Sequence, residues 1–333
     1  MSDVMVARPV LEGALAPSGA FEGFVRSGAT VEMKAFTGVT GDAGGFAVPK
    51  EIDSVIDRVL TAASPIRRIA NVVKVGTAGY RKLVTTGGTP SVWAAETQAR
   101  PETATPAFQE IAPPMGELYA NPSASQAMLD DAAFDVEEWL AGEIAAEFAK
   151  AEGAAFVSGS GVNRPKGFLA YATSAAGDGT RAFGTLQHLG SGAAADLGPQ
   201  PAERLIDLVQ SLRAPYRRGA AFVMNSATVA RLRKLKTGDG AFLWQPSLVA
   251  GQPATLLGYP VVEAEDMPDV AANALPIAFG NFRAGYLVAE RTETAILRDP
   301  YSNKPFVGFY ATKRVGGAVV NSEAIKLLQI SAS

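Results

Sequence analysis

The sequence contains no cysteine and only one histidine, His188, among its 333 residues. Without thiols the chain can form neither a disulfide framework nor a thiolate site, and a lone histidine does not make the cysteine- and histidine-based ligand set of a zinc site. The stability of the folded protein must therefore come from packing or from assembly.

Long apolar runs and a charge bias are missing as well. No apolar run approaches the ~20 residues that span a bilayer, and the amino terminus, with Asp3 and Pro9, does not have the form of a signal peptide. The 30 basic and 33 acidic residues leave a net charge of −3, so charge gives no bias toward nucleic acid or an anionic membrane. We expect a soluble protein that is made in the cytoplasm and has no membrane partner.

The chain does contain enough apolar material for a large core. Hydrophobic residues make up 47% and charged residues 19%, which argues against intrinsic disorder. The 34 glycines and 21 prolines account for 55 of 333 residues, above the average of about 12%, and predict many turns and extended loops. Residues 1–48 are rich in glycine and alanine without a sustained period, and they are predicted to form an arm.

Two segments of the first half have the periodicity of helices. The first follows Pro49, with the apolar stripe Ile52, Val55, Ile56 and Val59. The stronger prediction is a long helix over residues 130–156, which begins at Asp130 or Asp131 or at a capping box of Asp135 and Glu138. Its apolar stripe consists of Val136, Trp139, Leu140, Ile144 and Phe148.

Residues 75–120 show a different pattern, with short extended runs and many glycine and proline residues. A structureless loop of this length inside a compact domain is unusual, so we expect a two-stranded excursion that leaves the body and packs on something else. Trp93 and Phe108 lie on it, and such side chains on a solvated loop require a partner that covers them.

The second half alternates helices and strands. Residues 220–224 are predicted to form a buried strand that ends at Asn225, a favourable N-cap for the next helix. Gly280-Asn281 is interpreted as a turn between two later strands, and the tail from Lys304 to Val320 as a long strand or hairpin arm. The mixture of helices and strands assigns the chain to the α+β class, without repeats of about 20–50 residues.

The motifs indicate no catalytic, cofactor-binding or metal-binding residues. The stretch FVSGSGVNRPKGF, residues 156–168, places glycines beside Arg164 and Lys166. It follows a helix, and Lys166 precedes Gly167 with no hydroxyl residue after it, unlike a Walker-type phosphate loop. A serine hydrolase needs a base beside its nucleophile, but no G-x-S-x-G motif exists, and His188, in a turn-rich stretch, is interpreted as a surface residue.

Residues 203–236 carry eight basic and two acidic side chains, a local net charge of +6. This charge could contact phosphate or an acidic partner, but the interpretation that we favour is a set of solvated helix faces.

Several stretches, by their order and spacing, resemble the major capsid protein of tailed bacteriophages and gene transfer agents. They include GGFAVP (44–49), SPIRRIANVV (64–73), VWAAETQARPETATPAF (92–108) and KRVGGAVVNSEAIKLL (313–328). The stretch 124–169, which holds the predicted long helix and ends in NRPKGFL (163–169), is another. The resemblance covers about residues 41–330. It implies a Hong Kong 97-type phage capsid fold with a spine helix at residues 130–156. The implied parts are an N-terminal arm at 1–48, an extended loop at 75–120, an axial domain at 200–292 and a peripheral domain at 49–74, 121–199 and 293–333.

This resemblance implies a structural protein without a cofactor, not an enzyme. Its copies would join as pentamers and hexamers into an icosahedral shell around double-stranded DNA, which is held by non-specific contact. The implied location is the virion capsid, assembled in the cytoplasm of a bacterial host. The other implied partners are portal and scaffolding or protease proteins. Many members carry an upstream scaffolding segment that this chain is too short to hold, so we expect a separate scaffolding protein or a shortened chain.

In this family the extended loop lies over a neighbouring subunit. The resemblance therefore assigns inter-subunit contacts to Trp93, Glu96, Arg100 and Phe108. Some members also join a loop lysine to an asparagine of the neighbour, with a glutamate as proton acceptor. Here Arg100, Pro305 and Thr312 occupy the matching positions, and a guanidinium stays protonated and cannot act as the amine nucleophile. The shell is therefore expected to be non-crosslinked.

Two alternatives stay open on the sequence. The first is an encapsulin-type shell, a cellular compartment that encloses enzymes instead of DNA. The second is a soluble α+β enzyme that uses only carboxylates, lysine and arginine, which the lack of any convergent site makes the weaker interpretation.

Overall fold

The computed structural model of the chain describes residues 64–76, 79–88, 91–103, 105–131, 136–236, 244, 254–291 and 295–332. The predicted arm at residues 1–48 and the predicted helix after Pro49 lie outside the described residues. By compactness the chain divides into two units. Unit 1 holds Met1–Leu60, Tyr119–Glu147 and Glu293–Thr312, and unit 2 holds Thr61–Leu118, Phe148–Thr292 and Lys313–Ser333.

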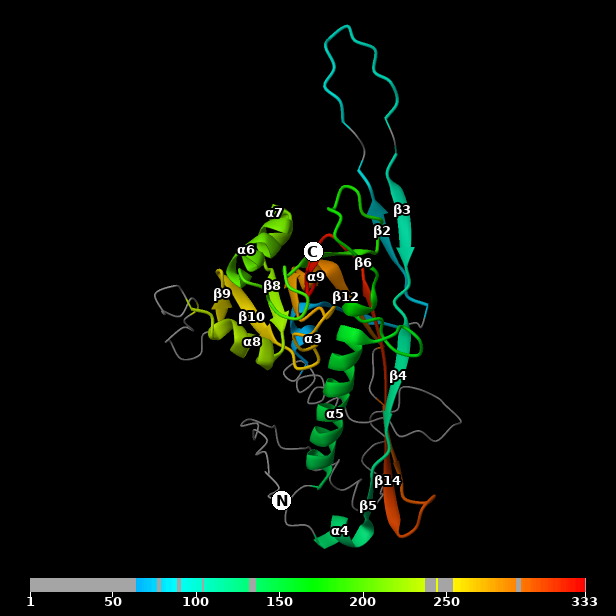
Figure 1. Cartoon of the computed structure of the whole chain (residues 1–333). Coiled ribbons are helices and arrows are strands. Elements are labelled where there is room, and N and C mark those ends of the chain that lie inside the picture. The colour runs from blue at the N-terminus through cyan, green and yellow to red at the C-terminus, as the bar shows by residue number, and fades with distance from the viewer. Residues whose placement is uncertain are drawn as a thin grey trace. The chain divides into compact units, whose positions relative to one another are not determined.

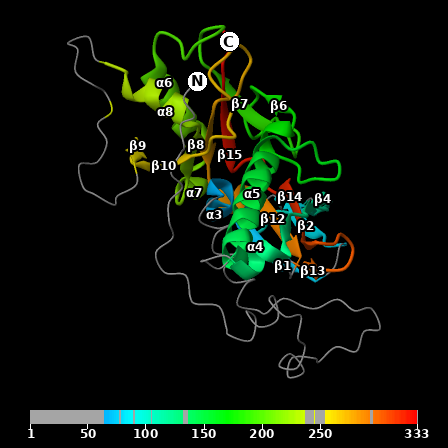
Figure 2. The same ribbon diagram turned by 90° about the horizontal axis from the view of Figure 1, so that it is seen from below.

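A seven-stranded mixed sheet forms the centre of unit 2. Its strands follow the order β6 (Thr173–Ser174), β7 (Leu186–Gly190), β15 (Ile325–Gln329), β11 (Ile277–Gly280), β8 (Ala221–Met224), β10 (Tyr259–Glu263) and β9 (Thr255–Leu256). The pairs β6–β7, β7–β15 and β8–β10 are parallel, and the other neighbours are antiparallel. Helices α6 (Pro201–Ser211) and α8 (Ser226–Arg233) lie together on one side of β8 and β15 (Figures 1 and 2).

Both faces of this sheet are buried, as strand β8 shows. Phe222 and Met224 belong to the core that contains the apolar residues of α6 and α8, whereas Ala221 and Val223 belong to the core on the opposite face. A strand buried on both faces needs a continuous apolar run, and the predicted strand is confirmed. Asn225 then caps α8 as predicted, because its side-chain oxygen accepts a hydrogen bond from the Thr228 N–H at 2.8 Å.

The residues predicted as a turn after β11 instead begin a short helix, α9 (Phe282–Gly285). The side-chain oxygen of Asn281 accepts a hydrogen bond from the backbone N–H of Ala284 at 3.1 Å. Asparagine stabilises a turn and a helix start through the same side-chain-to-backbone bond, so the local sequence alone did not separate the two.

A second sheet is built around the long strand β14 (Phe306–Val319). In unit 2, β1 (Asn71–Val75) pairs with β12 (Tyr286–Arg291) in parallel, and β12 pairs with the carboxyl-terminal half of β14 in antiparallel. In unit 1, β13 (Ala295–Asp299) and β5 (Ser123–Ser125) pair with its amino-terminal half. Strand β4 (Met115–Ala120) also pairs with β14. The predicted long strand in the tail is confirmed.

Helices α4 (Gln126–Asp131) and α5 (Val136–Ser158) occupy the region predicted as one helix. The prediction is confirmed from Val136 onward, whereas Asp130 and Asp131 belong to α4 and residues 132–135 lie outside the described part. The predicted stripe is wrong at Trp139, which is 49% exposed. Alanines at positions 141, 145 and 149 are buried beside Ile144 and Phe148, so the buried face of α5 is centred away from Trp139.

The remaining short helices of unit 2 are α3 (Pro65–Ile69), α7 (Ala214–Arg217) and the 3-10 turn η2 (Phe168–Ala170). Strands β2 (Lys82–Thr86) and β3 (Ala107–Ile111) form a separate two-stranded antiparallel sheet, with Lys82 opposite Ile111 and Thr86 opposite Ala107. The loop that joins them stands clear of the seven-stranded sheet (Figure 1). The predicted two-stranded excursion within residues 75–120 is therefore confirmed.

Candidate subunit-contact surfaces

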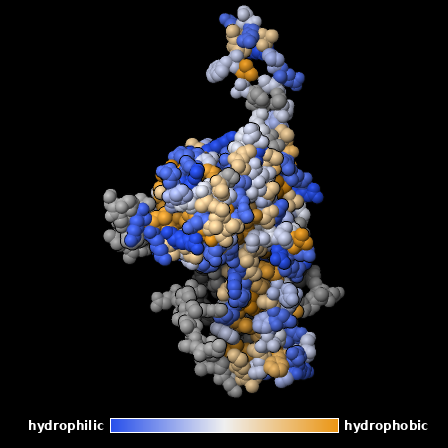
Figure 3. Space-filling view, in the orientation of Figure 1, coloured by the Kyte–Doolittle hydropathy of each residue, from blue (hydrophilic) through white to orange (hydrophobic). Residues whose placement is uncertain are grey.

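The extended loop between β2 and β3 exposes large apolar side chains. Trp93 is 100% exposed and Val92 75%, and in the two strands Leu83 and Phe108 are 68% and 70% exposed. Every described residue from 91 to 103 is exposed, and apolar and polar residues alternate over the tip of the loop (Figure 3). A single exposed leucine is ordinary, but a fully exposed tryptophan among other apolar residues marks a contact surface.

The tip of this loop has a defined turn. The Gln98 N–H donates to the Ala95 carbonyl at 3.1 Å, and the Ala95 N–H donates to the Gln98 side-chain oxygen at 3.2 Å. At the base of the hairpin, Arg81 Nη1 lies 2.9 Å from Glu110 Oε1. The turn reduces the conformational entropy that the loop loses when it is ordered in a contact.

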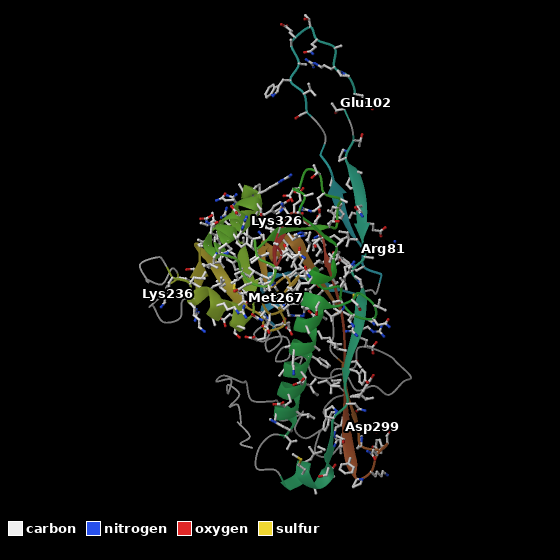
Figure 4. All side chains as sticks on the ribbon, viewed as in Figure 1. Arg81, Glu102, Lys236, Met267, Asp299 and Lys326 are labelled. Carbon is white, nitrogen blue, oxygen red and sulfur yellow. The ribbon has the colours of Figure 1, made fainter. Side chains whose placement is uncertain are left out.

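The residues predicted to make inter-subunit contacts lie together on this excursion. Glu96 is in the turn at the tip, Arg100 follows it, and both are exposed, while Phe108 lies on β3 opposite Thr85. Figure 4 labels Glu102 on the return limb of the loop and Arg81 near its base. Acidic and basic side chains therefore flank the apolar residues of the loop.

The other two predicted crosslink positions lie in unit 1. Pro305 is exposed and precedes β14, and Thr312 is a half-buried residue of β14 opposite Ala295. Neither side chain carries a carboxamide or a carboxylate, so the functional groups that the crosslink requires are missing at these positions.

A second apolar surface, which the sequence reasoning missed, lies in unit 1. Strand β14 turns Val307 and Phe309 inward, into a core with Ala124, Leu129 and Val136. Its outward residues Phe306 and Tyr310 are 43% and 38% exposed. Leu297 of β13 is opposite Tyr310, and the ring of Tyr119, 70% exposed, lies 6.3 Å from the ring of Tyr310. We call Tyr119, Leu297, Phe306 and Tyr310 the apolar sheet face.

The apolar sheet face could have been found from alternation in the sequence. One face of an antiparallel strand at a protein surface is normally polar. In β14, however, Phe306 and Tyr310 on one face and Val307 and Phe309 on the other are all aromatic or aliphatic. Which residues of β4 and β13 join them depends on strand pairing, which the sequence does not show.

Two backbone donors of the turn after α5 are engaged in hydrogen bonds within the chain. The Lys166 N–H donates to the Gly317 carbonyl at 3.0 Å and the Gly167 N–H donates to the Gly159 carbonyl at 2.9 Å. Gly161 has φ +81°, as the left-handed turn at a helix end requires. The Lys166 ammonium lies 4.1 Å from the centre of the Tyr171 ring. These contacts occupy two backbone donors of the turn and hold the Lys166 side chain against Tyr171.

His188 is not the surface turn residue that the sequence predicted. It lies in β7, opposite Leu327 of β15, and it is half-buried. Burial lowers the pKa of its imidazole.

In the described part of the chain, no cluster of three or more histidine, cysteine, aspartate or glutamate residues could hold a metal ion. The described helices include none that is both long and apolar enough to cross a membrane.

Several basic residues of segment 203–236 pair with carboxylates. Arg213 contacts Asp178 and Glu323, at 3.4 and 3.2 Å, and Arg231 lies 3.4 Å from Asp196. These pairs reduce the local positive charge, as expected of solvated helix faces.

Comparisons with known proteins show the family of the chain. The model of the phage capsid family matches residues 44–330. The chain is 48% identical to a solved structure described as the capsid of an empty GTA (gene transfer agent) particle computed with C5 symmetry, with a TM-score of 0.72, covering 81% of this chain and 97% of that chain. It is 46% identical to the capsid of a native GTA particle, with a TM-score of 0.74, covering 91% of this chain and 99% of that chain.

A more distant structure shares the fold. The holo-SrpI encapsulin complex from Synechococcus elongatus is 13% identical, with a TM-score of 0.55, and the match covers 91% of this chain and 96% of that chain. No curated protein matches the chain.

Proposed function

The chain belongs to the phage capsid family, and we propose that its copies assemble as pentamers and hexamers into an icosahedral shell. It is a structural capsid protein with the Hong Kong 97-type fold. The observation that carries the proposal is the extended loop, whose Trp93 is 100% exposed in the single chain and therefore needs a cover that another copy supplies.

The cover that we assign to the loop is the apolar sheet face of a neighbouring copy. Each chain then gives one loop and receives one, a head-to-tail contact that closes into a ring when the rotation between copies is suitable. A buried tryptophan removes about 150–250 Å² from water, which at ~25 cal/mol per Å² is worth roughly 4–6 kcal/mol before the entropic cost of ordering the loop. Glu96 and Arg100 would make charge pairs at the rim of this contact.

The shell that we propose is non-crosslinked. Arg100 is exposed on the loop, but its guanidinium cannot act as an amine nucleophile, and Pro305 and Thr312 offer neither an acceptor amide nor a proton acceptor. Buried area, loop overlap and charge pairs would hold the copies together.

The proposed content of the shell is double-stranded DNA, bound by non-specific contact, and the proposed site of assembly is the cytoplasm of a bacterial host. The proposed further partners are portal and scaffolding or protease proteins.

The proposal includes the predicted domains, with an axial domain at residues 200–292, an arm at 1–48 and the peripheral domain as predicted. The alternative is an encapsulin-type compartment, and copurification of shells with an enzyme cargo would favour it.

Assembly of the purified protein tests the proposal. With scaffolding protein supplied, sedimentation and negative-stain microscopy should show capsomers or shells. Trp93→Ala and the pair Tyr119→Ala/Tyr310→Ala should each reduce assembly while the free subunit keeps its unfolding temperature. Val162→Ala is the matched control, because Val162 is 69% exposed outside both surfaces. Only monomers under every condition would refute shell formation, and equal assembly of all variants would refute the contact.

A further inference from the structure

Four charged side chains are enclosed in unit 2 and form a closed ring of ion pairs. They are Arg67 of α3, Glu152 of α5, Glu290 of β12 and Lys313 of β14, and their side chains are between 0% and 5% exposed. We call them the charge ring. Its two positive and two negative charges cancel, so the core carries no net charge from these groups.

Each carboxylate of the charge ring receives one contact from the arginine and one from the lysine. Arg67 donates hydrogen bonds to Glu152 Oε2, at 3.2 Å, and to Glu290 Oε2. Lys313 Nζ lies 2.9 Å from Glu152 Oε1 and 2.8 Å from Glu290 Oε1. The lysine contacts are ion pairs without the angles of good hydrogen bonds, so the planar guanidinium supplies the directional bonds of the ring.

The charge ring lies where the chain leaves unit 2. The chain passes between the two compact units at five points, and at three of them the unit 2 residue is Phe148, Thr292 or Lys313. Glu152 is about one helical turn inside the first of these points, Glu290 is two residues before the second, and Lys313 is the third itself. We call the parts of α5, β12 and β14 next to these points their roots. The roots of α5 and β12 each contact both Arg67 of α3 and Lys313 at the root of β14.

Stability alone does not account for such a ring. The desolvation of buried charges offsets much of their attraction, and apolar residues of similar volume often stabilise a protein as well or better. Apolar contacts, however, are not directional, whereas the hydrogen bonds of Arg67 hold α3 to α5 and to β12, and Lys313 of β14 pairs with the same two carboxylates. Directional contacts can fix the roots of three segments in place, which apolar packing alone does not do.

We propose that the charge ring is a conformational anchor, which fixes the roots of α5, β12 and β14 in unit 2. Bending of the segments that continue into unit 1 then begins beyond the ring and is not transmitted into the core of unit 2. This inference concerns the single chain and does not depend on shell formation.

Hydrogen exchange of free full-length subunits, read by mass spectrometry, tests the anchor. In the native chain the amides at the three roots, residues 148–158, 286–290 and 313–319, should exchange slowly. Lys313→Met should raise their exchange rates at least tenfold. Lys326→Met is the matched control, since Lys326 is also fully buried and also paired, with Asp178, but lies on β15. It should raise exchange in β7 and β15 and leave the three roots unchanged.

A variant without charges separates anchoring from stability. Arg67→Met/Glu152→Met/Glu290→Met/Lys313→Met replaces all four charged side chains by apolar ones, and it also provides the test if Lys313→Met does not fold. Its unfolding temperature should be close to that of the native chain, while exchange at the three roots stays raised at least tenfold. Native-like exchange at the roots in this variant would overturn the proposal, as would equal exchange at the roots in Lys313→Met and Lys326→Met.

Discussion

Two aspartates of unit 2, Asp178 and Asp266, lie in opposite electrostatic surroundings. Burial raises the pKa of Asp178, but hydrogen bonds from Lys326 and Arg181 outweigh this effect and hold the pKa below its usual value. Burial and the neighbouring charge of Glu265 raise the pKa of Asp266, against the opposing effect of Lys150. The ionised form is therefore favoured by folding at Asp178 and disfavoured at Asp266.

This contrast predicts opposite effects of two isosteric substitutions. At pH 7, Asp178→Asn should lower the unfolding free energy by about 3 kcal/mol, because it leaves the buried Lys326 without its anionic partner. Asp266→Asn should raise the unfolding temperature. Asp178 contributes stability above the unfolded-state pKa of about 4 and loses it as the pH falls through its lower folded-state pKa, so the loss in Asp178→Asn shrinks in acid.

For Asp266 the contribution of the ionised carboxylate to the unfolding free energy has the opposite sign. Its raised folded-state pKa penalises folding at neutral pH, and the penalty disappears as the pH falls below the unfolded-state value. The gain in Asp266→Asn should therefore vanish near pH 3. Thermal unfolding of free subunits between pH 3 and pH 8 measures both differences, and the same sign for the two variants at pH 7 would contradict the assignment.

Two glycines, Gly142 of α5 and Gly167 of the turn that follows it, differ in how much space surrounds them. A Cβ at Gly142 would meet no atom of the described residues within 4 Å, so their packing does not require glycine there. A Cβ at Gly167 would lie 2.4 Å from the backbone carbonyl of Val157, and backbone atoms cannot move aside as a flexible side chain can.

We predict that Gly142→Ala stabilises the protein and Gly167→Ala destabilises it. The first change should add about 0.5–1 kcal/mol to the unfolding free energy, because alanine loses less backbone entropy than glycine in a helix. The second should cost several times that amount by forcing the turn away from α5. Urea unfolding of free subunits gives both values, and a loss of stability in Gly142→Ala would show that this glycine has a role that its surroundings do not reveal.

The extended loop is the element whose state should change most on assembly. We predict that chymotrypsin cuts free subunits at Trp93, because the described residues 91–103 are all exposed and such loop tips are preferred cleavage sites. In assembled shells the same cut should be at least tenfold slower, since in the proposed contact a neighbouring copy covers the loop. Time courses on denaturing gels measure both rates. Equal rates in the two states would count against the loop as a contact surface.

At the scale of the whole molecule, the proposal of a non-crosslinked shell gives a simple prediction. Boiled shells should run as one band near the 34.6 kDa monomer. Arg100→Lys should give the same single band, because a lysine nucleophile alone has neither the asparagine nor the glutamate that the reaction requires at positions 305 and 312. A ladder of covalent multimers in the native shell would refute the non-crosslinked assignment.

The amino-acid sequence by itself determined the local elements and the class of the protein. The helix from Val136, the strand 221–224 with its cap Asn225, and the hairpin that carries Trp93 follow from periodicity, capping and turn residues, which act within a few positions of the chain. The order and spacing of these segments were also enough to indicate the capsid family.

Only the tertiary structure decided which distant residues meet. Arg67, Glu152, Glu290 and Lys313 are far apart in sequence, and none of them lies in a motif that predicts a buried ring. The apolar sheet face likewise depends on the register of Leu297 with Tyr310. The exposure of Trp139 depends on which face of α5 is buried, and this face contains the neighbouring alanines. The physical reason is that local patterns specify which side chains share a face of one element, whereas strand register and packing specify what that face contacts.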